Sequence, residues 1–381
     1  MKKIAVIGST GSIGRQTLEV VRRNPDKFKI VALSAGANAD LFIEQVKEFK
    51  PQVATLAVQT ESVTERLKGL KTELFFGKDA YKNAIGDFAD VALIALVGFT
   101  GLAAVTDAIN KGVSVALANK ESLVVGGETV MPLAKEKGVF IAPVDSEHSA
   151  LWQCLSFDFN KPFERLIITA SGGAFRDMDE KRLKTVTAAD ALKHPNWNMG
   201  AKITVDCATL VNKAYEVIEA HWLYSAPYDK IDVIIHRESV IHSMVEYKDG
   251  SVIAQMSYPT MELPISLALS YPDRLNCSVK RLDFASLGKL SFEAVDKNKY
   301  PCFDLILGAA KKGGVYGAVA NGANDRAVEL FLKGQIAFND IYGSIDGALS
   351  AFGENLPSDA DGYYAANAFA TRFVNRRFGI K

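Results

Sequence analysis

The sequence predicts an α/β protein whose first domain is a doubly wound parallel sheet of the Rossmann type. Short apolar runs rich in β-branched residues recur through the first part of the chain, with helical spacing between several of them, and this alternation is typical of a parallel sheet covered by helices. The first run passes directly into glycines and then into a helical pattern, which is the order strand, turn and helix. The runs are Lys3–Gly8, Ile30–Ala35, Val53–Val58, Val91–Val97, Val113–Ala118 and Val139–Pro143.

Composition narrows the class of function. With 381 residues the chain is long for one core and predicts two or three domains. The 44 basic and 44 acidic residues cancel, which argues against a nucleic-acid-binding surface but allows a local phosphate site. The four cysteines lie far apart without a CxxC pair, so we expect neither a zinc cluster nor a disulfide framework. The apolar stretch Ile4–Ile7 is too short for a signal peptide or a membrane span, so we expect a cytoplasmic protein.

The first turn has the glycine spacing GxxGxxG, at Gly8, Gly11 and Gly14. Glycines there allow a tight turn and the close approach of a pyrophosphate, whose charge would face the free N–H groups near Ser12 and Ile13. The alternative is a glycine-rich turn that only packs tightly.

The residues after the second apolar run bear on which dinucleotide is bound. NAD-selective domains usually place a carboxylate at this strand end, whereas this chain reads Ala35-Gly36-Ala37-Asn38. The missing carboxylate leaves room for a 2′-phosphate and favours NADP, although Asp40 lies close by.

The fifth run is followed by Asn119, Lys120 and Glu121, at the carboxyl end of a predicted strand. Ligands in such sheets bind at that edge. A lysine there can stabilise a developing oxyanion beside a nicotinamide. The alternative is an ordinary exposed lysine after a strand.

Asp145 and Glu147 stand two residues apart just after the last run. In an extended segment, side chains two apart point to the same side, so both carboxylates can reach one hard cation such as Mg²⁺ or Mn²⁺. The alternative is a pair of solvated loop residues.

A second region begins with a predicted strand, Arg165–Ala170, that leads into Ser171-Gly172-Gly173, a turn whose backbone N–H groups can hold an anion. The long connection that follows contains Trp197 and Met199 among turn-forming residues. We expect it to act as a lid that covers a ligand and excludes water, with glycines as hinges. The alternative is a hydrophobic anchor that pins the loop to the body.

A helix with a buried apolar stripe is predicted next, beginning near Thr204 or Asp206. On an adjoining face, Asn212, Lys213 and Glu216 have spacings of three and four and converge. Two interpretations stay open for them: a surface ion pair, or a third metal carboxylate beside a phosphate site.

The segments GSTGSIG, LANKESLV, PVDSEHSA, SGG, HPNWNMG and NK with the following Glu216 occur in this order in the 1-deoxy-D-xylulose 5-phosphate reductoisomerase family. The chain resembles that family over nearly its full length. The resemblance implies a metal-dependent isomerisation and an NADPH-dependent reduction of 1-deoxy-D-xylulose 5-phosphate to 2-C-methyl-D-erythritol 4-phosphate, an isoprenoid precursor. It also implies Mg²⁺ or Mn²⁺ as metal and a homodimer with no nucleic-acid or membrane partner.

The domain organisation that the resemblance implies begins with the NADPH-binding domain. The expected parts are an NADPH-binding domain over 1–144, a catalytic and dimerisation domain over 145–272 with a flap at about 172–200, a linker over 273–300 and a C-terminal helical domain over 301–381. The runs DVIIH and Val252–Ser257 are expected to form a sheet used in dimer contact.

The resemblance assigns roles residue by residue. Its metal ligands are Asp145, Glu147 and Glu216, which with Lys120 are its catalytic residues. The positions that match substrate contacts are Ser146, Glu147, Ser171, His194, Trp197, Met199, Cys207, Asn212, Lys213 and Glu216. The positions that match cofactor contacts are Thr10, Gly11, Ser12, Ile13, Gly36, Ala37, Asn38, Asn119, Glu121 and Gly200.

Three positions depart from the family pattern. Cys207 stands where the family usually has a serine that bonds the phosphate, and a thiol is a weaker donor than a hydroxyl, so we expect one softened contact. Ala37 stands where many relatives have a longer basic or polar residue, and Glu262 replaces a customary arginine. We attach no function to Glu262.

Two other functions remain open from the sequence. One is an NADP-dependent dehydrogenase of another small phosphorylated carbonyl compound, without skeletal rearrangement. The other is a redox-sensing regulator that binds NADP and contacts partner proteins through its helical domain, but such a protein would not need three metal-type carboxylates.

Overall fold

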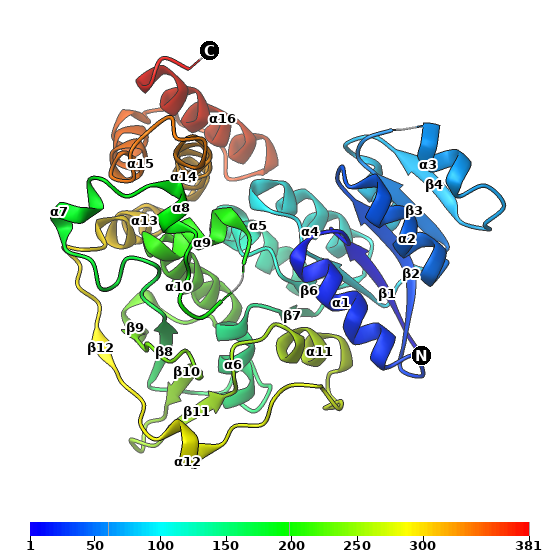
Figure 1. Ribbon diagram of the computed structural model, residues 1–381, viewed down its shortest axis with the longest axis horizontal. Coiled ribbons are helices and arrows are strands. Elements are labelled where there is room, and N and C mark those ends of the chain that lie inside the picture. The colour runs from blue at the N-terminus through cyan, green and yellow to red at the C-terminus, as the bar shows by residue number, and fades with distance from the viewer. Residues whose placement is uncertain (60, 198, 381) are drawn as a thin grey trace. The chain divides into compact units, whose positions relative to one another are not determined.

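The computed structural model describes residues 1–59, 61–197 and 199–380, and they form two compact units (Figure 1). The first unit comprises Met1–Asn119, Pro132–Ser149 and Thr260–Val279, and the second comprises Lys120–Met131, Ala150–Pro259 and Lys280–Lys381.

The first unit is built on a seven-stranded sheet with the order β4-β3-β2-β1-β5-β6-β7. Every neighbouring pair in it is parallel, which confirms the predicted doubly wound sheet. The strands are β1 Lys2–Ile7, β2 Phe28–Ala35, β3 Val53–Leu56, β4 Glu73–Phe76, β5 Val91–Ile94, β6 Ser114–Leu117 and β7 Ile141–Pro143. The sequence did not predict β4, an edge strand whose side chains are only exposed or half-buried.

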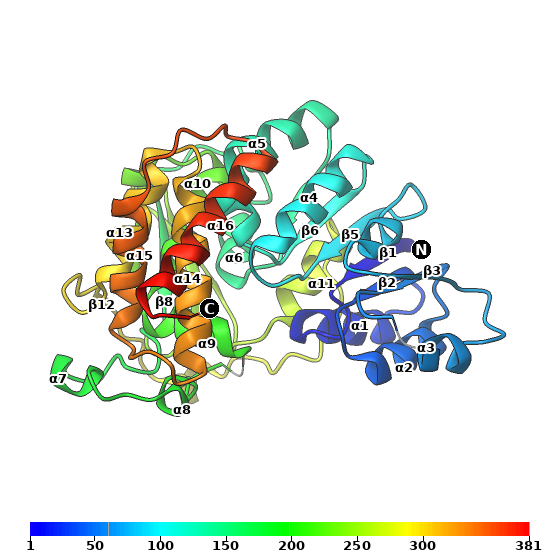
Figure 2. The ribbon, with the colours of Figure 1, turned by 90° about the horizontal axis from the view of Figure 1, so that it is seen from above.

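Helices cover both faces of this sheet. Figure 2 shows α1 and α2 on one side of the strands and α4 on the other. Strand order reverses at β1, which lies between β2 and β5, and a ligand crevice is expected at such a switch point. The helices and turns assigned to this part of the chain are α1 Ser12–Arg23, α2 Ala39–Phe49, α3 Glu61–Arg66, η1 Ala80–Ala84, η2 Gly98–Thr100, α4 Gly101–Asn110, α5 Glu121–Lys137, α6 Ser146–Cys154 and α11 Glu262–Ser270.

The glycines of the first turn are required by contact as well as by backbone angle. Gly8 has φ +100°, and a Cβ on Gly14 would lie 2.2 Å from the Gly8 carbonyl oxygen. Helix α1 therefore begins against the backbone of the turn, at a distance that any side chain at residue 14 would prevent.

The second unit contains a five-stranded mixed sheet with the order β11-β10-β8-β9-β12. Strands β8 and β9 are parallel, and the other neighbouring pairs are antiparallel. The strands are β8 Arg165–Ala170, β9 Ile231–Ile235, β10 Ile241–Glu246, β11 Val252–Met256 and β12 Glu293–Ala294. The predicted strand at 165–170 and the predicted sheet membership of the two later runs are confirmed.

The predicted long helix of the second unit is two helices. Helix α9, Ala201–Ala208, ends before Thr209, and α10, Val211–Tyr224, begins after Leu210. Leu210 has φ 57° and ψ 15°, a left-handed conformation that is rare for a leucine and ends the helical path. Short elements complete this region: α7 Glu180–Leu183, α8 Ala188–Ala191, η3 Tyr228–Lys230 and α12 Phe284–Leu287.

The carboxyl-terminal segment is helical, as predicted. Helix α14 packs against α13, α15 and α16 (Figure 2). The buried apolar residues of this segment include Ala318, Ala327, Leu330, Phe331, Ile341, Ile345 and Leu349. The bounds are α13 Pro301–Lys312, α14 Tyr316–Leu332, α15 Asp340–Ala351 and α16 Ala360–Arg377.

Two of the sequence-based expectations concern the cysteines and membrane-spanning helices. Cys154, Cys207, Cys277 and Cys302 are free thiols. Among the described residues, the helices are too short or too polar to cross a membrane.

Candidate active site

The carboxyl edge of β1 presents an open helix end. The Gly8 and Ser9 amides donate to the Ser34 carbonyl oxygen at 2.8 Å each and tie the turn to β2. Gly11 is the N-cap of α1, and no side chain of the described residues caps this helix. The first-turn N–H groups at Ser12 and Ile13 are thus available to an anion, and both residues are exposed or half-buried.

The end of β2 is exposed and roomy. Gly36, Ala37 and Asn38 are all exposed, and a Cβ on Gly36 would meet nothing within 4 Å. The Asn38 Oδ1 accepts a hydrogen bond from the Leu41 amide at 3.2 Å and caps α2. One predicted cofactor position therefore also has a structural task.

The residues after β6 are buried and engaged. The Asn119 Nδ2 donates to the carbonyl oxygens of Leu96, at 2.8 Å, and Gly98, at 2.9 Å, so Asn119 ties the loop after β5 to the end of β6. Glu121, in the first turn of α5, contacts the Lys202 ammonium at 3.2 Å.

The Lys202 ammonium also contacts the carboxylates of Asp206, at 2.9 Å, and Asp325, at 3.0 Å. Burial raises the pKa of Asp325 to about 6. Three carboxylates around one ammonium therefore link helices α5, α9 and α14.

Asp145 and Glu147 do not lie in an extended segment, contrary to the prediction. Helix α6 begins at Ser146, and the Ser149 amide donates to the Asp145 carbonyl oxygen at 2.8 Å, which is the first turn of a helix. The Ser146 amide donates to the Asp145 Oδ1 at 3.1 Å. The Ser146 Oγ donates to the Glu147 Oε2 at 2.6 Å.

Aromatic packing ties α6 to α10. The Trp152 ring stacks on Phe159 with centroids 5.7 Å apart, and Phe159 packs on Tyr224 at 5.5 Å. Trp152 lies on α6 and Tyr224 ends α10, so Phe159 links the two helices through aromatic contacts.

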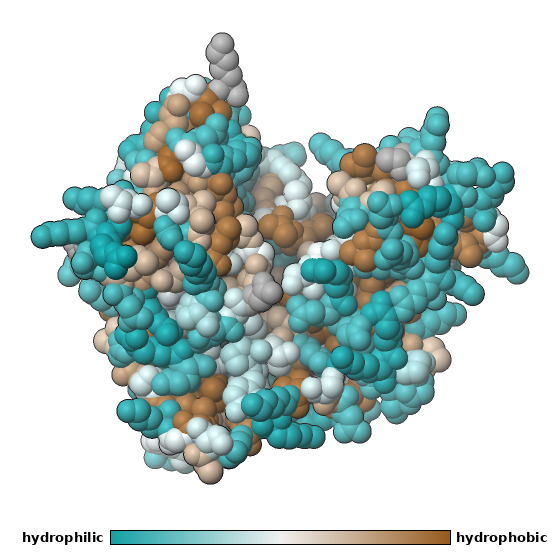
Figure 3. Space-filling view, in the orientation of Figure 1, coloured by the Kyte–Doolittle hydropathy of each residue, from teal (hydrophilic) through white to brown (hydrophobic). Residues whose placement is uncertain are grey.

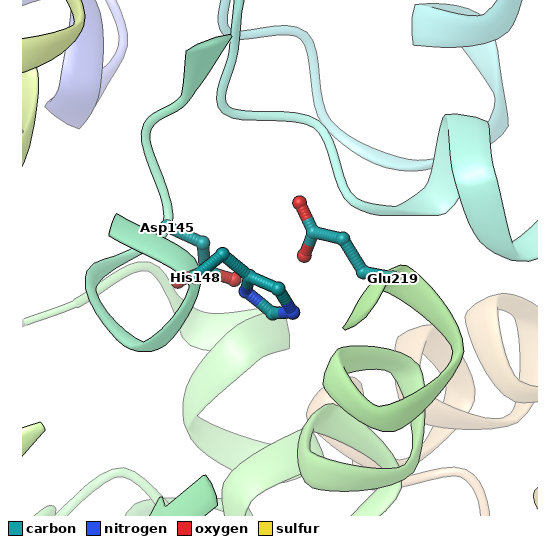
Figure 4. A group of neighbouring side chains, drawn as sticks. All are labelled: Asp145, His148 and Glu219. Carbon is teal, nitrogen blue, oxygen red and sulfur yellow. The ribbon is translucent and has the colours of Figure 1, made fainter. Parts of the chain in front are cut away.

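Carboxylates from these two helices form a potential metal-binding group. Asp145, Glu147 and Glu216 each offer an oxygen, and these atoms all lie within 4.8 Å of one another. Asp145, His148 and Glu219 form a second such group by the same measure (Figure 4). His148 and Glu219 were not identified from the sequence. In a helical segment each lies three residues beyond a predicted ligand, His148 beyond Asp145 and Glu219 beyond Glu216, and so on the same helix face.

Glu216 is held by three buried partners. The Lys120 Nζ donates to the Glu216 Oε1 at 3.0 Å and to the Asn212 Oδ1 at 2.8 Å. The Asn212 Nδ2 donates to the same Glu216 oxygen at 2.5 Å, and Lys213 pairs with the other. Lys213 is 4% exposed and Glu216 1% exposed, so the interpretation of these two residues as a surface ion pair is wrong. The predicted convergence of Asn212, Lys213 and Glu216 is confirmed.

Ser171 and His194 form a directed pair. The His194 Nδ1 accepts from the backbone amides of Asn196, at 3.2 Å, and Trp197, at 3.0 Å. The proton of the neutral ring is therefore on Nε2, which lies 3.0 Å from the Ser171 Oγ. The Gly173 amide also donates to this Oγ, at 3.2 Å, so the Ser171 hydroxyl proton is left to point at another acceptor.

Cys207 adjoins the same turn. Gly173 has φ +71°, and a Cβ there would lie 2.5 Å from the Cys207 carbonyl oxygen, so the glycine turn packs against the end of α9. Burial, with a smaller contribution from the Glu216 charge, raises the pKa of the Cys207 thiol. Cys207 is therefore a neutral thiol at pH 7, able to donate weakly.

The predicted flap, 172–200, is described except for residue 198. The Asn196 Nδ2 donates to the Arg237 carbonyl oxygen at 2.6 Å and to the Ser239 Oγ at 2.7 Å. The Trp197 and His242 rings lie 6.1 Å apart. In this conformation Trp197 therefore packs near His242, and its action as part of a lid stays a prediction. Met199 is half-buried, and the exposed Gly200 is the N-cap of α9.

A dinucleotide edge in the first unit and a buried lysine and carboxylate cluster in the second are what a carbonyl-reducing enzyme requires. The fold and this chemistry indicate a dinucleotide-dependent oxidoreductase.

Family models identify the particular group of enzymes. The reductoisomerase model matches 4–127, the reductoisomerase C-terminal domain model 141–224, and the DXP reductoisomerase C-terminal domain model 256–373. The 1-deoxy-D-xylulose 5-phosphate reductoisomerase of Chloroherpeton thalassium is 45% identical over 379 residues, 98% of this chain and 97% of that protein. The chain belongs to the 1-deoxy-D-xylulose 5-phosphate reductoisomerase family.

Solved structures agree in fold over the full chain. The Zymomonas mobilis reductoisomerase in complex with NADPH has a TM-score of 0.92 and 37% identity, covering 99% of this chain and 98% of its own. A DOX-P reductoisomerase in complex with NADPH, fosmidomycin and magnesium has a TM-score of 0.94 and 34% identity, covering 100% and 98%.

His194 is expected to remain neutral down to acid pH. Burial, with the nearby Arg176 charge, lowers its pKa from 6.5 to about 4. The unfolded chain therefore binds more protons between these pH values, and acidification from 6.5 to 4 favours unfolding, while above 6.5 the effect is absent. Ring-proton NMR should give a His194 midpoint near 4, and the His194→Gln variant should lose less stability on acidification. A midpoint near 6.5 contradicts the described hydrogen bonding.

Proposed function

We infer that this chain converts 1-deoxy-D-xylulose 5-phosphate to 2-C-methyl-D-erythritol 4-phosphate, using NADPH and a divalent metal ion, in the supply of isoprenoid precursors. The observation that supports this most is the buried group of Glu216 with Lys120, Asn212 and Lys213. A dehydrogenase that only transfers hydride to a phosphorylated carbonyl does not need Asp145 and Glu147 grouped with Glu216.

The donor set fits a hard cation. Asp145, Glu147 and Glu216 offer only carboxylate oxygens, which suit Mg²⁺ or Mn²⁺. When bound, such an ion polarises the substrate's carbonyl and hydroxyl oxygens as a Lewis acid. The Ser146 hydroxyl, which donates to Glu147 at 2.6 Å, orients that carboxylate and leaves Ser146 beside the substrate hydroxyls.

The phosphate of the substrate is bound by groups that meet around the glycine turn and the start of α10. The Ser171 hydroxyl donates its single proton to a phosphate oxygen, because the bonds from His194 and Gly173 already use the oxygen as an acceptor. Lys213 supplies positive charge, with Asn212 and Cys207 as further donors. His194 acts as a positioning residue that keeps Ser171 turned toward the ligand.

The reduction step requires an acidic group near the carbonyl oxygen. The Lys120 ammonium, buried and already directed at Glu216 and Asn212, donates to the oxygen on which negative charge develops. The flap residues Trp197 and Met199 exclude water from the reacting atoms when they lie over the substrate.

The dinucleotide occupies the carboxyl edge of the parallel sheet. Its pyrophosphate lies at the first turn of α1, at Thr10, Gly11, Ser12 and Ile13, and its adenosine ribose lies at Gly36, Ala37 and Asn38. The remaining positions proposed for cofactor contact are Asn119, Glu121 and Gly200.

We also propose that the enzyme is a cytoplasmic homodimer that joins through the five-stranded sheet. Strand β11 ends the strand order, and its Val252 and Ile253 are 50% and 46% exposed. Phe284 and Phe292 add exposed apolar surface. Figure 3 shows apolar atoms among hydrophilic ones over the end of the second unit where Figure 1 labels β11 and α12.

Sedimentation velocity is expected to give a dimer for the wild type. The Val252→Asp, Ile253→Asp double variant should be a monomer, because it places two charges on the exposed apolar strand. A monomeric wild type contradicts the proposal.

Metal dependence and Glu216 provide the main test. Chelated protein should not oxidise NADPH with 1-deoxy-D-xylulose 5-phosphate, and Mg²⁺ or Mn²⁺ should restore oxidation with methylerythritol phosphate as product. Glu216→Gln should lower kcat/KM by a factor of about 100 or more, because it removes a metal ligand and a charge partner of two lysines. The exposed Glu136→Gln variant is the control. Metal-independent turnover, or an alcohol product with an unrearranged carbon chain, contradicts the proposal.

The thiol of Cys207 is expected to weaken phosphate binding. Cys207→Ser replaces a weak donor by a hydroxyl at the same position, so the substrate KM should fall by a factor of about 2 to 10, the range of a neutral hydrogen bond. The KM for NADPH serves as the internal control and should not change. An unchanged or raised substrate KM would exclude a phosphate contact at Cys207.

A further inference from the structure

We propose that Arg66 binds the 2′-phosphate of NADPH and sets this chain's preference for NADPH over NADH. The proposal rests on the dinucleotide position given above and adds to it a residue that the family pattern does not identify. Its basis is the surroundings of the β2 strand end within the first unit.

The strand end itself lacks a cation. The exposed residues that follow β2 are Gly36, Ala37 and Asn38, and none of these three carries charge. The acidic residue nearest in sequence, Asp40, lies in the first turn of α2 and is 80% exposed. A carboxylate in this region normally favours NAD, because it accepts from the ribose hydroxyl and repels a phosphate.

Arg66 changes the charge at this place. It ends α3, which lies beside α2 (Figures 1 and 2), and its Nη1 donates to the Asp40 Oδ1. Strands β2 and β3 are parallel neighbours with Ala35 opposite Leu56, so the connections to α2 and α3 leave the sheet at one edge. The Arg66 guanidinium therefore lies at the first turn of α2, close in sequence to Gly36, Ala37 and Asn38.

The geometry of arginine suits a second, stronger partner. The Arg66 side chain is 43% exposed. Its planar guanidinium has five N–H donors on three nitrogens, and the Nη1 nitrogen donates to Asp40. An exposed ion pair of this kind contributes little, so Arg66 can turn toward a phosphate at small cost, and a doubly charged phosphate binds arginine in bidentate fashion. Asp40 holds the side chain near the site when the cofactor is absent.

The test compares the two cofactors in five proteins. NADPH and NADH are titrated, by quenching of protein fluorescence, into the wild type and the Arg66→Ala, Arg66→Lys and Asp40→Asn variants. The exposed Lys47→Ala variant, at the last turn of α2, is the control for lost positive charge. Thermal denaturation of each variant verifies that the fold is kept.

Arg66→Ala is expected to raise the Kd for NADPH by a factor of about 10 or more, the effect of a charge-assisted contact, and to change the Kd for NADH less than twofold. Arg66→Lys should recover part of the loss, and Asp40→Asn should tighten NADPH alone.

Equal weakening of both cofactors, or an unchanged NADPH Kd in Arg66→Ala, overturns the role of Arg66 while NADPH binding by the wild type preserves the proposed function. A wild type that binds neither cofactor overturns both.

Discussion

The buried carboxylate of Glu216 is the group on which the second unit's chemistry depends. An isolated carboxylate at 1% exposure would be strongly unfavourable, and three donors compensate for its burial: the ammonium groups of Lys120 and Lys213 and the amide of Asn212. Two ammonium groups and one carboxylate give these four side chains one net formal positive charge. The same contacts that make burial tolerable therefore leave a site biased toward an anionic ligand and toward additional carboxylates.

The first unit depends on close backbone approach instead. The turn after β1 brings the start of α1 to within van der Waals distance of a carbonyl oxygen, which only glycine at position 14 permits. This places an uncapped helix end at the strand-order switch point. Charge plays a small part in this arrangement, since backbone amide groups supply the donors. The two units thus use different physics: oriented main-chain dipoles in one, and buried side-chain ions in the other.

The sequence predicted most of this fold because apolar periodicity is strongest where burial is greatest. Six strands of the large sheet were found from runs that are buried on both faces, whereas β4 was missed because Glu73–Phe76 is a short edge strand without that pattern. The candidate site residues were predicted from several segments in family order. Their local geometry was not predicted: Asp145 immediately precedes helix α6, so its relation to Glu147 differs from the predicted one, and His148 and Glu219 stayed unrecognised. Nor does the sequence signal a left-handed leucine at position 210.

That leucine has a consequence for the proposed phosphate site. A single helix begun near Thr204 would place its positive dipole end there and spend the amides of residues 212 and 213 on internal bonds. The reversal of backbone hand at Leu210 creates a second amino-terminal end, so that the amide groups of Asn212 and Lys213 belong to a first turn. The partial positive charge of α10 then adds to the charge of the Lys213 side chain. One residue's backbone conformation thereby converts the middle of a predicted helix into an anion-attracting terminus.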